Sequence, residues 1–161
     1  MSTNGAVNII SESRKLGIYN HSDSYPTWLG VRALKLAYWA AEAPTRVAGL
    51  VRNVRLVKDE DEPTDAEREQ YAEYWQDVDS GRSWYACLRG LQGNVADSLK
   101  LGVIVAQDKV LHAGGWLAWT YTLDLVAGTF IVEDGEHTTV FPLADLPAND
   151  TDFLERVPDS Y

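Results

Sequence analysis

The strongest structural signal in this sequence is a two-residue alternation near its carboxyl end. Successive side chains of a strand point to opposite faces, so apolar residues at every second position predict a strand with one apolar face. Such a face must be covered by another layer of structure. The alternation runs from residue 117 to residue 125, through Leu117, Trp119, Tyr121, Leu123 and Leu125.

Further strands are expected on both sides of the chain. Residues 129–133 and 136–141 follow the alternating segment, and the dipeptide Asp134-Gly135 between them is favoured in tight hairpins because both residues tolerate positive φ. Near the amino end, residues 6–10 and 16–19 flank a polar stretch and predict a second hairpin. The carboxyl-terminal strands therefore form a three-strand meander, and the amino-terminal strands form a separate hairpin.

The middle of the chain changes to helical spacing. Apolar residues from Val31 to Ala41 predict a helix over about residues 28–41, which Ala43-Pro44 ends. A short helix over 45–50 and a strand over 53–57 follow. Residues 83–93 are expected to be helical until their glycines, residues 95–105 fit either helix or strand, and the tail after Pro142 is expected to contain at most one helical turn.

A capping box predicts one more helix. Thr64 and Glu67 have the spacing at which each side chain satisfies a free backbone donor of the other residue at a helix start. The helix is expected to continue far enough to carry an apolar, mainly aromatic stripe on one face. That stripe consists of Tyr71, Tyr74, Trp75 and Val78.

These elements predict one α+β domain over residues 1–161. Its sheet is expected to be mainly antiparallel, built from the amino-terminal hairpin and the carboxyl-terminal three-strand meander, and covered by two or three helices. A chain of 161 residues falls within the usual size of one domain, and its 45% hydrophobic content can supply a core. The single cysteine, Cys87, cannot form an intramolecular disulfide and indicates the cytoplasm.

The charge of the chain limits its partners. The formal net charge is −10, which disfavours binding to phosphate backbones and leaves basic protein surfaces or cationic ligands as easier partners. Residues 58–69 hold seven acids and two bases. They are interpreted either as a solvated helix start, matched to the helix dipole, or as an acidic face that imitates DNA phosphates. No window is long and apolar enough to predict a membrane span.

The stretch YNHSDSYPTWLG, residues 19–30, contains the candidate catalytic residues His21 and Asp23. A histidine two residues from a carboxylate can act as a base with its orienting partner, or the two can bind a metal ion. A metal site would need further ligands, and His112 and His137 show no distinctive spacing, so no metal and no cofactor are predicted. The alternative is structural: Asp23 accepts hydrogen bonds from amides of its own turn, and His21 lies at the rim.

The same stretch contains candidate binding residues. Tyr19, Tyr25 and Trp28 could line a pocket for a planar or cationic ligand, or contact a partner, because aromatic faces attract cations and stack on rings. They could equally close one end of the core, with Pro26 fixing the corner. Gly30 is expected to let the following helix approach the sheet closely.

Other nucleophiles have simpler interpretations. Cys87 beside Trp84 is interpreted as a buried small apolar residue rather than a reactive thiol. If Met1 is removed, Ser2 could act as an amino-terminal nucleophile. The sequence contains none of the GxxxxGK[ST], HExxH, CxxC, GxSxG or EF-hand motifs, which argues against the enzyme and binding classes that they define.

Three motifs together resemble a family of small phage and prophage proteins. They are the Tyr, Asp, Tyr-Pro and Gly of residues 19–30 after a short hairpin, WYACLRGLQG at 84–93, and WTYTLDLVAGTFIVEDG at 119–135. The family commonly has Trp before the Asp and Gly after it, where this chain has Ser22 and Ser24. The resemblance implies a phage or prophage origin and a shared fold, and it implies no mechanism.

Three functions are compatible with these features. The first is an accessory protein that binds a host or phage macromolecule, in defence evasion or host takeover. The second is an enzyme, such as a hydrolase, or a small-ligand-binding protein that uses the loop of His21 and Asp23. The third is a component of the virus particle.

Overall fold

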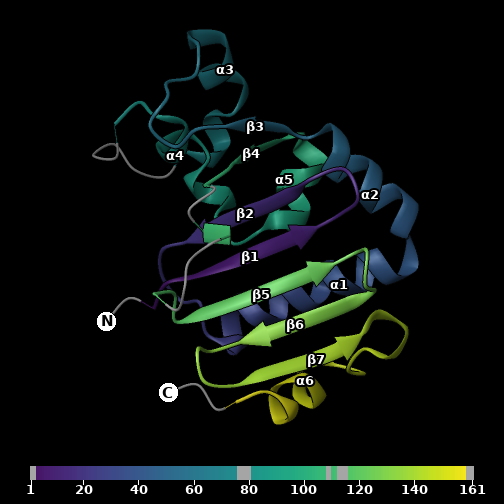
Figure 1. Ribbon diagram of the computed structural model, residues 1–161. Coiled ribbons are helices and arrows are strands. Elements are labelled where there is room, and N and C mark those ends of the chain that lie inside the picture. The colour runs from purple at the N-terminus through teal and green to yellow at the C-terminus, as the bar shows by residue number, and fades with distance from the viewer. Residues whose placement is uncertain (1–2, 76–80, 108–109, 112–115, 159–161) are drawn as a thin grey trace.

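The computed structural model describes residues 3–75, 81–107, 110–111 and 116–158. A five-stranded sheet occupies the centre, helices lie behind it, and a lobe of short elements extends beyond its β2 edge (Figure 1). The chain starts in the sheet, builds the helices and the lobe in its middle, and then returns to the sheet. The predicted α+β class is confirmed.

The sheet joins the two predicted strand groups side by side. Its strands follow the order β2-β1-β5-β6-β7. The hairpin β1–β2 and the meander β5–β6–β7 are antiparallel, as predicted, whereas β1 and β5 pair in parallel with Gly5 opposite Trp119. The strands are β1 (Gly5–Ile10), β2 (Lys15–Asn20), β5 (Trp119–Asp124), β6 (Thr129–Glu133) and β7 (Thr138–Pro142).

The strand β5 carries the alternation that predicted it, although it is shorter than residues 117–125. Trp119, Tyr121 and Leu123 are buried in the main core. Leu117 precedes the strand and packs instead with Ala6, which points to the opposite face of the sheet from its neighbour Val7. The apolar pattern therefore extends past the strand because both faces of the sheet are partly covered at this end.

The last hairpin is wider than the dipeptide Asp134-Gly135 suggested. Strand β7 begins at Thr138, and of the two turn residues only Gly135 has a positive φ, at 93°. The carboxylate of Asp134 accepts hydrogen bonds from the backbone N–H groups of Glu136 (2.9 Å) and His137 (2.7 Å). These bonds close a four-residue loop, which delays the start of the predicted strand.

Helices cover one face of the sheet. Helix α1 (Val31–Glu42) crosses behind β5 and β6, and α2 (Pro44–Asn53) and α5 (Val95–Leu101) lie nearer to β1 and β2 (Figure 1). A π-helical segment, η1 (Pro26–Gly30), replaces the first turn of the predicted helix. The chain breaks between α1 and α2 at Ala43-Pro44, as expected, because proline at a helix start lacks only an N–H that would be unpaired there.

The tail contains more helix than the sequence suggested. After a short turn, η6 (Leu143–Asp145), helix α6 (Asp150–Arg156) has seven residues, so the prediction of at most one turn was wrong. The side chain of Asn149 caps α6 by accepting a hydrogen bond from the backbone N–H of Asp152 at 2.8 Å. Phe153 is fully buried between Phe130 and Phe141, at ring-centroid distances of 6.1 and 6.0 Å. Burial of this ring stabilises the longer helix.

The lobe contains a small parallel sheet and its own apolar cluster. Strands β3 (Arg55–Val57) and β4 (Val103–Val105) pair in parallel. The undecided region 95–105 is thus helix α5 followed by strand β4, with Gly102 between them at φ 95°. The other lobe elements are α3 (Asp65–Gln70), η2 (Ala72–Tyr74), α4 (Trp84–Cys87) and η4 (Arg89–Leu91). The buried cluster consists of Val57, Tyr71, Trp84, Cys87, Leu88, Leu91 and Val103.

The predicted aromatic helix beyond the capping box was wrong. Helix α3 begins at the capping box but ends at Gln70 and buries none of its own residues. The backbone leaves helical geometry at Tyr71, whose ring is buried against Trp84 at 6.0 Å. A six-residue helix without a buried face is marginal, so packing of Tyr71 decides the path. Trp75 is exposed, and Val78 lies outside the described residues.

Candidate functional site

The corner loop, residues 19–30, is fixed from inside by buried polar side chains. The Asn20 amide nitrogen donates hydrogen bonds to the hydroxyl of Ser24 (2.9 Å) and to the carbonyl of Ser22. The Tyr121 hydroxyl, on β5, donates to the Ser24 carbonyl at 2.7 Å. Burial raises the pKa of Tyr121 far above its ordinary value, so this phenol remains a neutral donor. The loop is thereby tied to the centre of the sheet.

His21 and Asp23 both lie at the surface of this loop. The Nδ1 atom of His21 is 3.4 Å from the Tyr19 hydroxyl. Asp23 is exposed and adopts a positive φ of 57°, which an aspartate tolerates better than most residues. The structural alternative, in which Asp23 accepts hydrogen bonds from amides of its own turn, stays a prediction; the turn is held by Asn20, which donates to a carbonyl and a hydroxyl. The catalytic role of His21 and Asp23 also stays a prediction.

Tyr25 and Trp28 pack on the main core rather than beside Tyr19. Trp28 lies against Gly93, where an added Cβ would come within 2.7 Å of the indole, and the Arg32 guanidinium covers its ring at 3.7 Å. Tyr25 is half-buried at the margin of the main core. An added Cβ on Gly30 would lie 3.0 Å from the Tyr121 ring, so this glycine does allow the close approach that was predicted.

Among the predicted binding residues, Tyr19 lines a cavity. The cavity is a crevice of about 40 Å³ between β2, the segment from α4 to η4, and β4. Burial, followed by the neighbouring Tyr85, raises the pKa of Tyr19, although a hydrogen bond from Asn4 opposes the shift. Tyr19 also stacks on Trp116 at 6.0 Å. Its polar neighbours at the crevice are Tyr85, Arg89, Gln92, Ser98 and Gln107.

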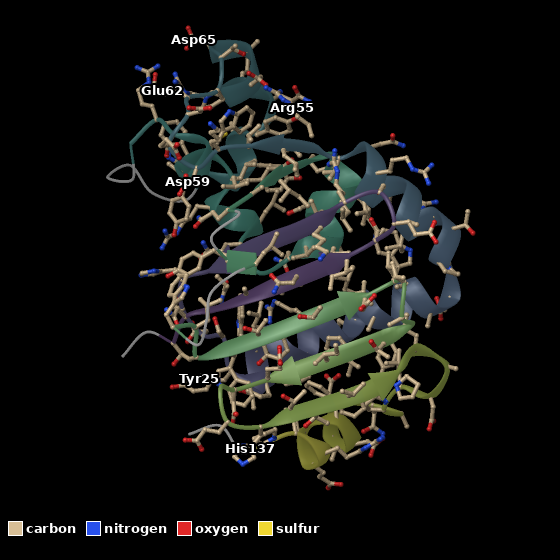
Figure 2. All side chains as sticks on the ribbon, viewed as in Figure 1. Tyr25, Arg55, Asp59, Glu62, Asp65 and His137 are labelled. Atoms are coloured by element: carbon tan, nitrogen blue, oxygen red, sulfur yellow. The ribbon has the colours of Figure 1, made fainter. Side chains whose placement is uncertain are left out.

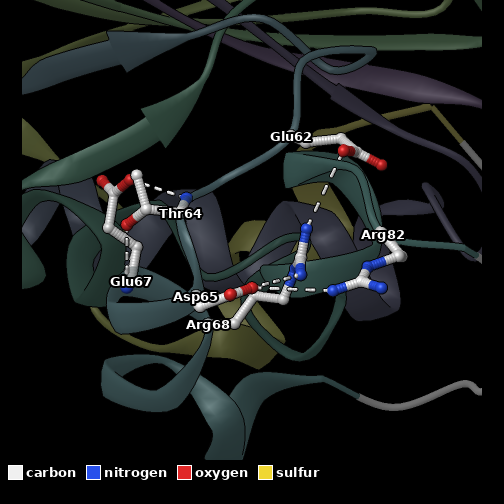
Figure 3. Close-up of polar contacts among 6 residues, drawn as sticks. All are labelled: Glu62, Thr64, Asp65, Glu67, Arg68 and Arg82. Atoms are coloured by element: carbon white, nitrogen blue, oxygen red, sulfur yellow. Dashed lines mark hydrogen bonds and ion pairs between the residues drawn. The ribbon is translucent and has the colours of Figure 1, made fainter.

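The acidic segment, residues 58–69, lies in the lobe. Figure 2 shows Arg55, Asp59, Glu62 and Asp65 gathered there, whereas Tyr25 and His137 lie toward the other end of the sheet. Asp65 forms ion pairs with Arg68 (3.1 Å) and with Arg82 (3.6 Å), and Glu62 lies 4.0 Å from Arg68 (Figure 3). These are surface pairs, each of which contributes little to stability.

The capping box holds the start of the lobe helix α3. The hydroxyl of Thr64 accepts a hydrogen bond from the backbone N–H of Glu67 (3.2 Å), and the carboxylate of Glu67 accepts one from the backbone N–H of Thr64 (3.0 Å) (Figure 3). This second bond, followed by the contact with Arg55, holds the pKa of Glu67 below its usual 4.5. Glu67 therefore stays ionised and helps to fix the acidic segment.

The remaining nucleophile and ligand candidates do not assemble into a centre. Cys87 is buried in the lobe cluster, and burial raises the pKa of its thiol, as expected for an inert cysteine. His137 pairs with Asp134 at 3.2 Å within its own hairpin. Ser2 and His112 lie outside the described residues. Across the ranges that the structure describes, no three His, Cys, Asp or Glu side chains are grouped to hold a metal ion.

Sequence reasoning did not identify most of the polar residues around Tyr19. Asn20 and Ser24 looked like ordinary turn residues, and their partner Tyr121 is far away in the sequence. One local signal was present: Tyr85 and Arg89 are four residues apart, a spacing that places side chains together on one side of a helical turn. The Arg89 guanidinium donates to the Tyr85 hydroxyl at 2.7 Å.

Within the described part of the chain, none of the helices has the length and apolar character that crossing a bilayer requires. Comparison with protein-family models, with curated proteins and with solved structures finds no match to this chain.

Proposed function

We propose that this protein acts by binding a basic surface of a partner protein through its lobe. The main support is the concentration of negative charge in the acidic segment. The acidic segment contains twelve of the 161 residues, yet its seven acids and two bases contribute −5 to the formal net charge of −10. A field of this kind attracts basic protein surfaces and repels nucleic acids.

Several carboxylates of the lobe remain available to a partner. Glu60, Asp61, Glu69 and Glu73 are exposed, and none of them pairs with a basic side chain in the described part of the chain. Asp65 and Glu67, by contrast, already form ion pairs, Asp65 with Arg68 and Arg82 and Glu67 with Arg55. Two exposed apolar side chains, Leu56 and Trp75, lie in the same lobe. Charge and apolar contact are thus offered together, as protein interfaces require.

A groove beside the acidic segment could accommodate part of the partner. It has a volume of about 440 Å³ and lies where β3 and β4 end. Its apolar lining includes the exposed Leu56, and its rim includes Asp59 and Glu60. An extended segment of a partner could place an apolar side chain in this groove and a lysine or arginine against the carboxylates. Its full lining is Leu56, Val57, Lys58, Asp59, Glu60, Ala106 and Gln107.

The resemblance to small phage and prophage proteins supports a host or phage protein as the partner. On this proposal the chain is an accessory protein that redirects or blocks its partner, rather than a catalyst. Mass spectrometry of purified virus particles separates this role from that of a particle component, because an accessory protein would not co-purify in fixed proportion to the capsid.

The direct experiment is a quantitative pull-down from host lysate with charge-matched variants. The double variant D59N/E60Q neutralises two carboxylates at the groove, and D145N/E155Q neutralises two exposed carboxylates in the carboxyl-terminal region. A partner should be captured by the wild type and by D145N/E155Q, but much less by D59N/E60Q, and capture should fall as salt rises. Equal capture by all three proteins, or no salt dependence, would contradict the proposal.

A further inference from the structure

The crevice beside Tyr19 has an apolar interior and a polar mouth. Leu88, Leu91, Val103 and Ile104 are buried at its walls. Tyr85, Arg89 and Gln92 are half-buried at its opening, together with Tyr19. A volume of about 40 Å³ suits a few water molecules or one small aliphatic group.

The orientation of the Gln92 amide at the mouth follows from its partners. The backbone N–H of His21 donates to Oε1 of Gln92 at 3.4 Å. A backbone N–H can only donate, so the oxygen of this amide must face His21. The amide nitrogen then faces the other way and donates to the Tyr85 hydroxyl at 3.2 Å.

The Tyr85 hydroxyl receives a second donor. A guanidinium N–H of Arg89 reaches the same oxygen at 2.7 Å. A phenol oxygen has two acceptor positions and one proton, and both acceptor positions are now occupied. The hydroxyl can therefore interact with a further group only by donating its proton, and the described part of the chain provides no acceptor for that proton.

Among the residues that the structure describes, Arg89 also retains unused donors. A guanidinium carries five N–H groups, and the hydrogen bond to Tyr85 uses one of them. Arg89 forms no ion pair with any carboxylate in the described ranges. Its guanidinium lies 5.0 Å from the centre of the Tyr85 ring, which restrains its position. The mouth of the crevice is thus a local cluster of donors in a chain with a net charge of −10.

We propose that this crevice binds a small carboxylate group, either a free monocarboxylate or the carboxyl terminus of a peptide. The planar guanidinium of Arg89 matches a carboxylate in two-point contact, and the Tyr85 hydroxyl supplies a third donor. The aliphatic group next to the carboxylate enters the apolar interior. Repulsion from the acidic segment is weakened by salt, because charges separated by more than about 10 Å are largely screened at 0.1 M ionic strength. Apart from Gln107, which lines both the crevice and the groove, this site uses other residues than the proposed protein-binding lobe surface, so the two proposals are tested separately.

The test is an NMR titration with defined probes. Propionate should shift the side-chain resonances of Arg89 and Gln92 in a saturable way, whereas propionamide, which lacks the charge, should not. A short peptide ending in alanine is compared with the same peptide ending in an amide. Tighter binding of the free peptide acid than of propionate assigns the site to a chain terminus, and the reverse assigns it to a small metabolite.

Three variants locate the binding. Y85F removes the hydroxyl but keeps the ring, and R89K keeps the charge but removes the planar fork. Each should weaken propionate binding by about tenfold or more, because each removes a hydrogen bond to a charged group. R46K, which changes an exposed arginine on α2, should bind as the wild type does. Dispersed spectra of all variants confirm that they fold.

Three results would overturn the proposal. The first is the absence of saturable shifts with propionate or the peptide acid at concentrations up to about 100 mM. The second is equal binding of propionamide. The third is stronger binding of inorganic phosphate than of propionate at these resonances, which would assign the donors to a different anion.

Discussion

The central sheet with its covering helices and the lobe both contain helices and strands, but they differ in strand length and in how deeply their core residues are buried. The sheet has five- and six-residue strands, and Tyr121, Phe130 and Phe141 are buried to within 1% exposure. The lobe has three-residue strands, and its cluster members Tyr71 and Val57 keep 9% and 8% exposure. Small clusters with few buried contacts open more easily than large ones. The difference indicates a stable central sheet that carries a less stable lobe.

The largest effect is expected in the sheet. Phe153→Ala should lower the free energy of unfolding by about 3–5 kcal/mol, because it leaves a cavity beside Phe130 and Phe141. Urea unfolding followed by tryptophan fluorescence measures the loss. A matched change on the same helix, the half-buried Leu154→Ala, should cost clearly less. Equal losses would mean that α6 is not anchored through Phe153.

An intermediate effect is expected where the corner loop meets the sheet. Tyr121→Phe removes the donor to the buried Ser24 carbonyl and should cost about 1–3 kcal/mol, because that acceptor is left unpaired. Tyr25→Phe is the control, since its hydroxyl makes no hydrogen bond to the described residues. Thermal unfolding compares the two variants. A loss confined to Tyr25→Phe would contradict the assigned hydrogen bond.

A smaller effect is expected in the lobe, and it should depend on pH. The folded state lowers the pKa of Glu67 below its usual 4.5, through the capping bond with Thr64 and the contact with Arg55. The resulting stabilisation is complete above the unfolded-state pKa and is lost as pH falls through the folded-state pKa. Glu67→Gln keeps the capping geometry but not the charge. The protection of lobe amides from hydrogen exchange should therefore fall more between pH 6 and pH 3 in the wild type than in this variant. The difference between the two proteins separates the effect of Glu67 from that of the other carboxylates.

The smallest effect is expected at the exposed rim of the corner loop. His21→Ala and Asp23→Asn should each change stability by no more than about 0.5 kcal/mol, because both side chains are exposed. Asparagine is chosen because it tolerates the positive φ of Asp23. If either residue serves catalysis or ligand binding, these variants lose that function while melting normally. A large drop in melting temperature would show a structural role.

Local patterns predicted much of this fold because their causes are local. The alternation around Tyr121 predicted a strand, the spacing of Thr64 and Glu67 predicted a helix start, and Gly30 predicted a close approach. The parallel pairing of β1 with β5 has no local sign, because its partners are distant in the sequence. The burial of Ser24 next to Tyr121, and of Phe153 in the main core, was not predicted for the same reason: the contacting residues are distant in the sequence.

The candidate sites were less predictable than the fold. Tyr19, Tyr25 and Trp28 were grouped because they are neighbours in the sequence, but of these three only Tyr19 lines the crevice. Most other crevice residues come from the segment around Tyr85 and from β4. A site depends on which segments meet, and that is decided by long-range packing. The helix predicted through Tyr71 was wrong for the same reason, because the Tyr71 ring packs on Trp84, which is distant in the sequence.

Native-state hydrogen exchange of the wild-type protein tests the central comparison most directly. We expect amides of β1 and β5 to exchange only through global unfolding, and amides of β3, β4 and α4 to exchange through a local opening of lower free energy. Equal protection of both regions, falling together as denaturant is added, would show that the sheet and the lobe are one cooperative unit and would contradict the account.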